Sequence, residues 1–161
     1  MEYAIKTILY AADLGPYGPE IFKHAAGLAQ QFGAKIHIVH VVEPLTEYAQ
    51  SLIDTYVPDH VLESLRKEGH EQAMQEMHRR LETFCKEKLH AGAETLIADM
   101  RIVEGFAAQS ILQEAKRVSA NLIVMGAHGR SALGELLMGS VAHKVILKST
   151  LPVLLVPIKE G

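Results

Sequence analysis

Apolar positions along the chain follow two different periods. Short, continuous apolar runs have the length of buried strands, whereas longer segments repeat apolar residues every three or four positions, as amphipathic helices do. The runs predict five strands, at residues 6–13, 35–42, 95–103, 122–125 and 153–156. The longer periods predict helices at about residues 20–32, 60–90, 106–118 and 139–148. Strands that alternate with helices in this way indicate a parallel sheet with helices on both of its faces.

The first and the longest of these helices have distinct apolar faces. The first helix ends at Gly33, a residue suited to the C-terminus of a helix, and the longest contains Gly69, where it could break. The apolar face of the first helix consists of Ile21, Ala25, Leu28, Ala29 and Phe32. The apolar side of the longest helix consists of Met77, Leu81, Phe84 and Cys85.

Two segments depart from these patterns. In the third strand, Asp99 and Arg101 alternate with apolar residues, which is typical of an edge strand with one face toward water. Those apolar residues are Leu96, Ala98, Met100 and Ile102. The stretch from Glu43 to Pro58 has the least regular pattern, so we expect it to be irregular or weakly helical and to serve as a mobile flap.

Composition narrows the class of protein. With 161 residues the chain is long enough for one domain with a substantial core, so we expect a single domain over residues 1–161. Apolar residues make up 48% and charged residues 22%, which is typical of a globular, soluble protein. The formal net charge of −3 gives no indication of nucleic-acid binding.

Cysteine content and hydropathy indicate the compartment. Cys85 is the sole cysteine, so the chain has no internal disulfide and suits a reducing environment. No apolar run approaches the ~20 residues that span a bilayer. The apolar run before Asp13 is too short, and too soon followed by charge, for a signal peptide. We therefore expect a cytoplasmic protein that does not enter a membrane.

The strongest chemical signal follows the fourth strand. Residues 122–125 lead into Gly126-Ala127-His128-Gly129, and Gly139-Ser140 follows nine residues after Gly129, at a predicted helix start. Glycine lets backbone N–H groups approach a ligand closely, and a helix N-terminus adds unpaired N–H donors and a positive dipole end. This combination favours a phosphate group and hence a nucleotide. The alternative is an ordinary loop with turn glycines, since neither a Walker loop nor Gly-x-Gly-x-x-Gly occurs.

Asp13 lies at the carboxyl end of the first predicted strand. Ligands of open parallel sheets bind beyond the carboxyl ends of strands, so Asp13 and Gly126 would meet if the first and fourth strands are neighbours. The alternative is that Asp13 is a helix N-cap or a turn residue, since aspartate favours both positions, but its place at a strand end that faces the switch point favours a ligand contact. We expect Ser140 to be a helix N-cap, a role that is compatible with anion binding at the same place.

The spacing Gly126-x-x-Gly129, nine residues, Gly139-Ser140 resembles the nucleotide motif of the ATP-binding branch of the universal stress protein family. The resemblance extends over essentially the whole chain, with flanking strands in the matching order. The other matching segments are Ile8-Leu9-Tyr10 with Asp13, His40-Val41-Val42, Val103-Glu104-Gly105, Leu122-Ile123-Val124-Met125, and Pro152-Val153-Leu154-Leu155-Val156-Pro157.

The resemblance implies an α/β three-layer sandwich with a five-stranded parallel sheet in the order 3-2-1-4-5. This is the Rossmann-like fold of the adenine nucleotide alpha hydrolase type, with ATP at the carboxyl edge. By the same resemblance, Asp13 recognises the adenine or its ribose, Val41 packs against the base, and the motif glycines approach ribose and phosphates. The implied nucleotide-binding set is Ala11, Ala12, Asp13, Val41, Met125, Gly126, His128, Gly129, Arg130, Gly139, Ser140 and Val141.

The first strand departs from the family in one respect. The family often has Pro-x-Asp-x-Ser there, whereas this chain has Ala11-Ala12-Asp13-Leu14-Gly15, which removes the polar contact of the serine. In the glycine loop, His128 and Arg130 either contact phosphate or are solvated. The spacing of the other histidines gives no zinc site, so we expect no metal ligated by the protein alone. Mg²⁺ or Mn²⁺ carried on the triphosphate near Ser140 fits better.

The last strand, residues 153–156, is apolar on both faces. Helices on both sides of the sheet explain that pattern. The family resemblance adds that Val153, Leu154, Leu155 and Val156 pair with their copies in a second subunit. Pro152 and Pro157 would limit any further pairing. We therefore expect a homodimer.

Three functions remain for such a chain. The first is an ATP-binding regulatory switch in a stress response, acting through a protein partner. The second is a slow ATP hydrolase, which phosphoryl-transfer chemistry disfavours because no lysine lies in a phosphate loop and no carboxylate base is evident. The third is a dimerisation module that binds no nucleotide.

Overall fold

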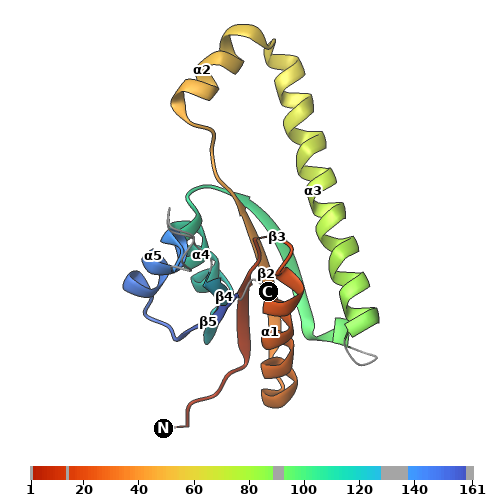
Figure 1. The fold of residues 1–161 in the computed structure, drawn as a ribbon, viewed down its shortest axis with the longest axis vertical. Helices are drawn as coiled ribbons and strands as arrows, with labels where there is room; N and C mark the ends of the chain where they lie inside the picture. Colours follow the sequence, from red (N-terminus) through yellow and green to blue (C-terminus); the bar gives the residue numbers. More distant parts are fainter. Residues whose placement is uncertain (1, 14, 89–92, 128–137, 159–161) are drawn as a thin grey trace.

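A computed structural model describes residues 2–13, 15–88, 93–127 and 138–158. These residues form one parallel, five-stranded sheet in the order β3-β2-β1-β4-β5. Its strands are β1 (Thr7–Ala11), β2 (Lys35–Val42), β3 (Ile97–Glu104), β4 (Leu122–Ala127) and β5 (Val153–Pro157). The predicted strand order is confirmed, and with it the positions of β3 and β5 at the two edges (Figure 1).

Helices cover both faces of this sheet (Figure 1). They are α1 (Gly18–Phe32), α2 (Glu47–Tyr56), α3 (Asp59–Lys88), α4 (Ala107–Arg117) and α5 (Ser140–Lys148), with a short 3-10 turn, η1, at Ala93–Leu96. The predicted three-layer sandwich is confirmed. No helix among the described residues combines the length and the apolar character that crossing a bilayer requires.

The alternation of side chains along the strands creates one core on each face. Toward α1, the core includes Ile8, Tyr10, Ile36, Ile38, Phe22 and Val124. Toward α4 and α5, it includes Leu9, Val39, Ile111, Ile123, Met125 and Val145. Burial of each such side chain contributes about 1.5–3 kcal/mol. Tyr10 donates its hydroxyl to the Gly18 carbonyl at 3.1 Å, and burial, followed by the nearby Asp13 charge, raises the pKa of this tyrosine.

The stretch Glu43–Pro58, which was expected to be irregular or weakly helical, contains the helix α2 and forms part of an extended arm. Within it, Thr46 caps α2 by accepting the Ala49 N–H at 3.2 Å, and α3 continues through Gly69 without a break. We define the arm as residues 45–72, which comprise α2 and the first half of α3. The arm projects beyond the carboxyl edge of the sheet (Figure 1). None of its side chains is buried.

The predicted face of the first helix needs one correction. Ile21, Ala25 and Ala29 are buried as expected, but Phe32 is 53% exposed and Phe22 takes its place in the core. Phe32 is the last residue of α1, directly before the left-handed Gly33, so it lies beyond the edge of the sheet core.

The edge strand β3 carries the wetter face that its sequence predicts. His37 on β2 contacts Asp99 at 2.8 Å, and Asp99 contacts Arg117 of α4 at 3.4 Å. The buried Glu114 lies between Arg117, at 2.9 Å, and Arg101, at 3.1 Å. Glu114 therefore has compensating charges on both sides, and the network joins α4 to the β2–β3 edge.

Candidate functional site

A pocket of about 340 Å³ opens at the carboxyl ends of β1, β2 and β4. The strand order reverses there. From β1 the chain adds β2 and β3 on one side, and it then returns to place β4 on the other side of β1. Open parallel sheets bind ligands at such a reversal. The pocket is lined by Ala11, Ala12, Asp13, Val39, His40, Val41, Glu43, Ala107, Ile111, Met125, Gly126, Val141 and Ala142.

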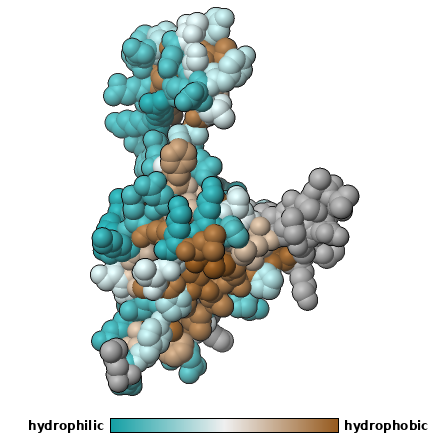
Figure 2. Space-filling view, turned by 90° about the vertical axis from the view of Figure 1, so that its left-hand side faces the viewer, coloured by the Kyte–Doolittle hydropathy of each residue, from teal (hydrophilic) through white to brown (hydrophobic). Residues whose placement is uncertain are grey.

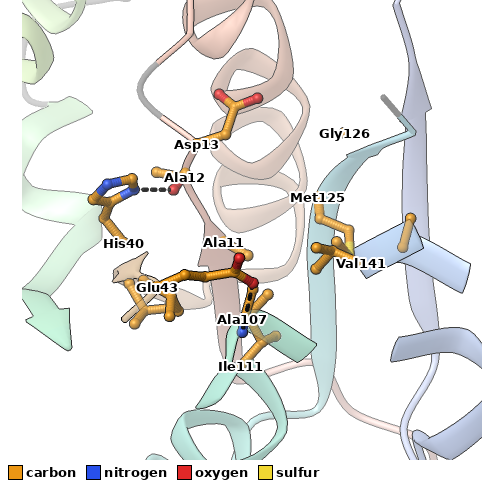
Figure 3. A pocket seen from close by; sticks show the side chains of 13 residues that line it. Ala11, Ala12, Asp13, His40, Glu43, Ala107, Ile111, Met125, Gly126 and Val141 are labelled. Carbon is orange, nitrogen blue, oxygen red and sulfur yellow. Dashed lines mark hydrogen bonds between the residues drawn. The ribbon is translucent and has the colours of Figure 1, made fainter. Parts of the chain in front are cut away.

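Most of the described residues that the sequence singles out meet in this pocket. Ala11, Ala12 and Asp13 come from the end of β1, Val41 from β2, Met125 and Gly126 from β4, and Val141 from α5. Figure 3 shows His40 and Glu43 on the left of the pocket and Met125, Gly126 and Val141 on the right. The pairing of β1 with β4 fulfils the condition under which Asp13 and Gly126 were expected to meet.

The remaining predicted residues lie beside the pocket or outside the described part of the chain. Gly139 and Ser140 immediately precede Val141 at the start of α5 but do not line the pocket themselves. His128, Gly129 and Arg130 fall outside the described residues. The described part of the predicted phosphate site is therefore the start of α5.

Asp13 is a turn residue at the rim of the pocket. Its Oδ1 accepts the backbone N–H of Gly15 at 2.8 Å, which confirms the turn alternative. The N-cap alternative is wrong, because the N-cap of α1 is Tyr17. A carboxylate has several acceptor sites on its two oxygens, so the turn contact is compatible with a contact to a ligand.

Gly126 has a packing role in addition to its place in the pocket. A Cβ at this position would lie 2.7 Å from Ile21 Cδ1 and 3.3 Å from Ile158 Cδ1. Both isoleucines are buried, so they have little room to move. The sequence interpretation explained this glycine by the approach of a ligand, and the close packing of Ile21 and Ile158 gives a second reason for a residue without a side chain here.

The start of α5 differs from the prediction by one residue. Gly139, with φ −60° and ψ 153°, is the N-cap, and Ser140 is the first helical residue, so the prediction of Ser140 as N-cap is wrong. Gly139 supplies no side-chain hydrogen bond to the helix. The first N–H groups of a helix have no partner within it. Those of α5 follow directly on the Gly139 cap, next to Val141 and Ala142 of the pocket wall.

Sequence reasoning missed the other residues of the pocket wall, which are Val39, His40, Glu43, Ala107, Ile111 and Ala142. Val39 lies two positions before Val41 on β2, so the two-residue period of a strand could have indicated it. Ala107 and Ile111 reach the pocket because the turn after β3 places α4 under the carboxyl edge (Figure 3). The sequence carries no local signal for that placement.

Two of the missed residues make polar contacts that hold the pocket together. His40 Nδ1 lies 2.7 Å from the Ala12 carbonyl oxygen, and since a carbonyl only accepts, Nδ1 is the donor. This bond joins the ends of β1 and β2. Glu43 Oε1 accepts the N–H of Ala107, the first residue of α4, at 3.3 Å.

The distribution of charge in the pocket is uneven. Asp13 and Glu43 are its acidic residues, and no lysine or arginine is among its described lining residues. The described residues include no group of three or more histidine, cysteine or acidic side chains that could hold a metal ion. Apolar side chains such as Val39, Val41 and Met125 offer a surface for a flat ring, and the start of α5 offers donors for an anion.

Comparison with known proteins agrees with this architecture. Residues 4–157 match the model of the universal stress protein family. A universal stress protein of Thermus aquaticus is 35% identical over 94% of this chain and 98% of its own length. The solved structure of protein MJ0577, from Methanocaldococcus jannaschii, superposes with a TM-score of 0.68 at 26% identity, covering 98% of this chain and 99% of that one.

A second solved structure is that of the universal stress protein from Archaeoglobus fulgidus in complex with dAMP. It superposes with a TM-score of 0.52 at 18% identity and covers 96% of this chain and 98% of its own. At that identity the likeness concerns the fold.

Proposed function

This chain belongs to the universal stress protein family, and on that premise we propose that it is a single-domain, ATP-binding regulatory protein of the stress response. The observation that carries the proposal is the convergence of Asp13, Val41, Met125, Gly126 and Val141 on one pocket at the reversal of the sheet. The A. fulgidus relative in complex with dAMP supports an adenine nucleotide as the ligand class.

In this proposal the adenine lies against Val41 and beside Asp13, and the phosphates extend toward Gly139, Ser140 and Val141. Asp13 would accept hydrogen bonds from base or ribose, and the α5 N–H groups would donate to phosphate oxygens. Charge-assisted hydrogen bonds contribute about 1.5–3 kcal/mol each, and micromolar affinity requires about 8 kcal/mol in total. A few such donors together with a buried base would reach that value. Mg²⁺ or Mn²⁺ would bind through the triphosphate near Ser140.

The pocket supports binding better than turnover. Enzymes that transfer phosphoryl groups stabilise the developing charge with metal ions and with lysine or arginine side chains. The described lining residues include no lysine or arginine. Their two carboxylates, Asp13 and Glu43, lie at the ends of β1 and β2 rather than at α5. We therefore propose a switch and keep slow ATP hydrolysis as a second outcome of the test below.

Two elements next to the pocket would transmit its occupancy. Glu43 leads into the arm, and α5 leads into the edge strand β5. We propose that two copies of the protein form a homodimer in the cytoplasm through β5. Figure 2 views the side of the molecule on which α5 lies, and a continuous hydrophobic area crosses the middle of that face. Exposed apolar residues on α5 include Ile146 and Leu147, and Val153, Leu154 and Leu155 of β5 are only partly buried. A ligand shifts such an assembly only if its affinity differs between the two states.

Mass spectrometry of the purified protein, before and after denaturation, tests the proposal. We expect ATP to be released on denaturation, or to be taken up when it is added to nucleotide-free protein. ADP that accumulates with time would instead indicate a hydrolase. Protein that releases no nucleotide and takes up none would contradict the proposal and leave a dimerisation module that needs no ligand.

A further inference from the structure

Two helices begin at the pocket, and a carboxylate occupies the start of one of them. Ala107 opens α4, while Val141 and Ala142 belong to the first turn of α5, and all three line the same cavity. Neither N-cap residue, Phe106 or Gly139, makes a side-chain hydrogen bond to its helix. Neither first turn contains an acidic residue. Among the described residues, the two helix starts differ by the carboxylate of Glu43, which accepts the Ala107 N–H at 3.3 Å.

The backbone around Glu43 is fixed by the turn that precedes α4. The Gly105 N–H donates to the Val42 carbonyl at 3.0 Å, which ties that turn to the residue before Glu43. Gly105 has φ +152°, and a Cβ there would lie 2.6 Å from Ser110 Oγ, so the turn requires glycine. Glu43 therefore reaches α4 from a segment held in place, as its dashed contact in Figure 3 shows.

We propose that Glu43 is a positioning residue that sets the direction in which a nucleotide lies in the pocket. The inference rests on the proposed function of the same site. The carboxylate engages the α4 donor that a phosphate would use, and its negative charge repels phosphate from that end. The polyanionic tail is thereby directed to α5, whose first turn has no such carboxylate. The base and the ribose, which carry hydrogen-bond donors, are left on the side of Asp13 and Glu43, where carboxylates accept.

Inorganic tripolyphosphate is the probe that separates the two helix starts, because it has no base to orient it. The isotopically labelled full chain is titrated with tripolyphosphate while backbone amide resonances are followed. In the wild-type protein we expect the amides of Val141 and Ala142 to shift and that of Ala107 to stay in place. In Glu43→Ala we expect the Ala107 amide to shift as well, and tripolyphosphate to bind about threefold more tightly or better, as loss of one repulsive charge predicts.

Two variants control for charge and for folding. Glu43→Gln keeps an oxygen acceptor for Ala107 but loses the charge, so its Ala107 shift should lie between those of the wild type and Glu43→Ala. Glu47→Gln makes the same change of charge four residues away, outside the described pocket lining, and should keep the wild-type pattern. If Glu43→Ala does not fold, the comparison of wild type with Glu43→Gln still tests the inference. The Ala107 amide must shift less in the wild type than in Glu43→Gln.

The outcomes distinguish this inference from the function on which it rests. A wild-type Ala107 amide that responds as strongly as Val141 would overturn the role of Glu43 and leave nucleotide binding intact. A folded Glu43→Ala variant with an unmoved Ala107 amide would overturn it equally. Wild-type protein in which neither ATP nor tripolyphosphate moves any pocket amide would contradict the proposed function, and the role of Glu43 with it.

Discussion

The sheet with its covering helices and the arm are stabilised in opposite ways. The side chains of Ile8, Phe22, Ile36 and Val124 are at most 1% exposed and pack in the core between the sheet and α1. In the arm, Tyr48 is 75% and Tyr56 78% exposed, and α2 contains no buried residue. The apolar side chains of the arm therefore form a surface, whereas those of the sheet form a core.

The residues that line the pocket and the side chains that the arm exposes therefore lie in separate parts of the molecule. Every described residue of the pocket wall belongs to the sheet, to α4 or α5, or to the segments at their ends. The arm joins this part of the molecule through the segment that begins at Glu43. Truncation of an exposed arm side chain such as Tyr56, which does not line the pocket, should therefore leave the stability of the sheet and the affinity for ATP nearly unchanged, whereas changes in the sheet should not.

The largest difference is expected between a core phenylalanine and an arm tyrosine. Phe22 is 1% exposed and packs on the Tyr10 ring at a centroid distance of 5.4 Å. Phe22→Ala should lower the free energy of unfolding by about 4 kcal/mol, because it leaves a cavity in the core. Tyr56→Ala should change it by less than about 0.5 kcal/mol, as for other exposed positions. Urea denaturation measures both, and equal losses would show that the arm is part of the cooperative core.

The next effect concerns the start of α5. Gly139 has extended backbone angles that valine also adopts, so Gly139→Val should fold normally. Its side chain should block phosphate and weaken ATP binding by about thirtyfold, or about 2 kcal/mol. Calorimetry compares it with Tyr56→Ala, which should bind like the wild type. Unchanged ATP affinity in Gly139→Val would remove the phosphate assignment from this helix.

A pair of glycine substitutions should give effects of opposite sign. Gly126→Ala forces a Cβ to within 2.7 Å of Ile21 Cδ1 and should cost about 1 kcal/mol of stability. Gly69→Ala lies in α3 with no atom within 4 Å of the new Cβ, and should stabilise the helix by about 0.5–1 kcal/mol. Thermal denaturation measures the two shifts. A stabilising Gly126→Ala would mean that α1 packs less closely on β4 than the structure shows.

The smallest effect is expected at Glu76, where α3 passes from the arm to the buried Met77. Hydrogen bonds from Arg79 and Arg80 lower the pKa of Glu76 from 4.5 to about 2. Because the folded pKa is the lower one, this carboxylate stabilises α3 above pH 4.5, and the effect is lost as the pH falls toward 2. Circular dichroism should show a small excess of helix in wild type over Glu76→Gln at pH 6 that vanishes near pH 2. An excess that persists at pH 2 would contradict the assignment.

The strand pattern and its connection to the site could be read from the sequence. The apolar run of β2 predicts its bounds to the residue, and Asp13 and Gly126 meet in the pocket because strand ends in a parallel sheet share an edge. Such features depend on local apolar runs and on one topological rule, both of which a single sequence carries. The strand order and the places of Val41 and Met125 were instead implied by the family resemblance.

Features that depend on packing between distant segments could not be read in this way. The stretch that contains α2 was expected to be irregular or weakly helical, and its bounds were not predicted, because its exposed residues Tyr48, Leu52 and Tyr56 have no core to face. The cap of α5 differed by one residue because Gly139 and Ser140 are both acceptable caps. Glu43 directly follows β2, but its contact with Ala107 joins residues 64 positions apart, which no local pattern indicates.

A crystal structure of the protein grown with ATP and Mg²⁺ tests the central claim most directly. We predict adenine beside Asp13 and Val41 and phosphates at the first turn of α5. A nucleotide bound elsewhere on the molecule, or a pocket that side chains fill in the presence of saturating ATP, would contradict it.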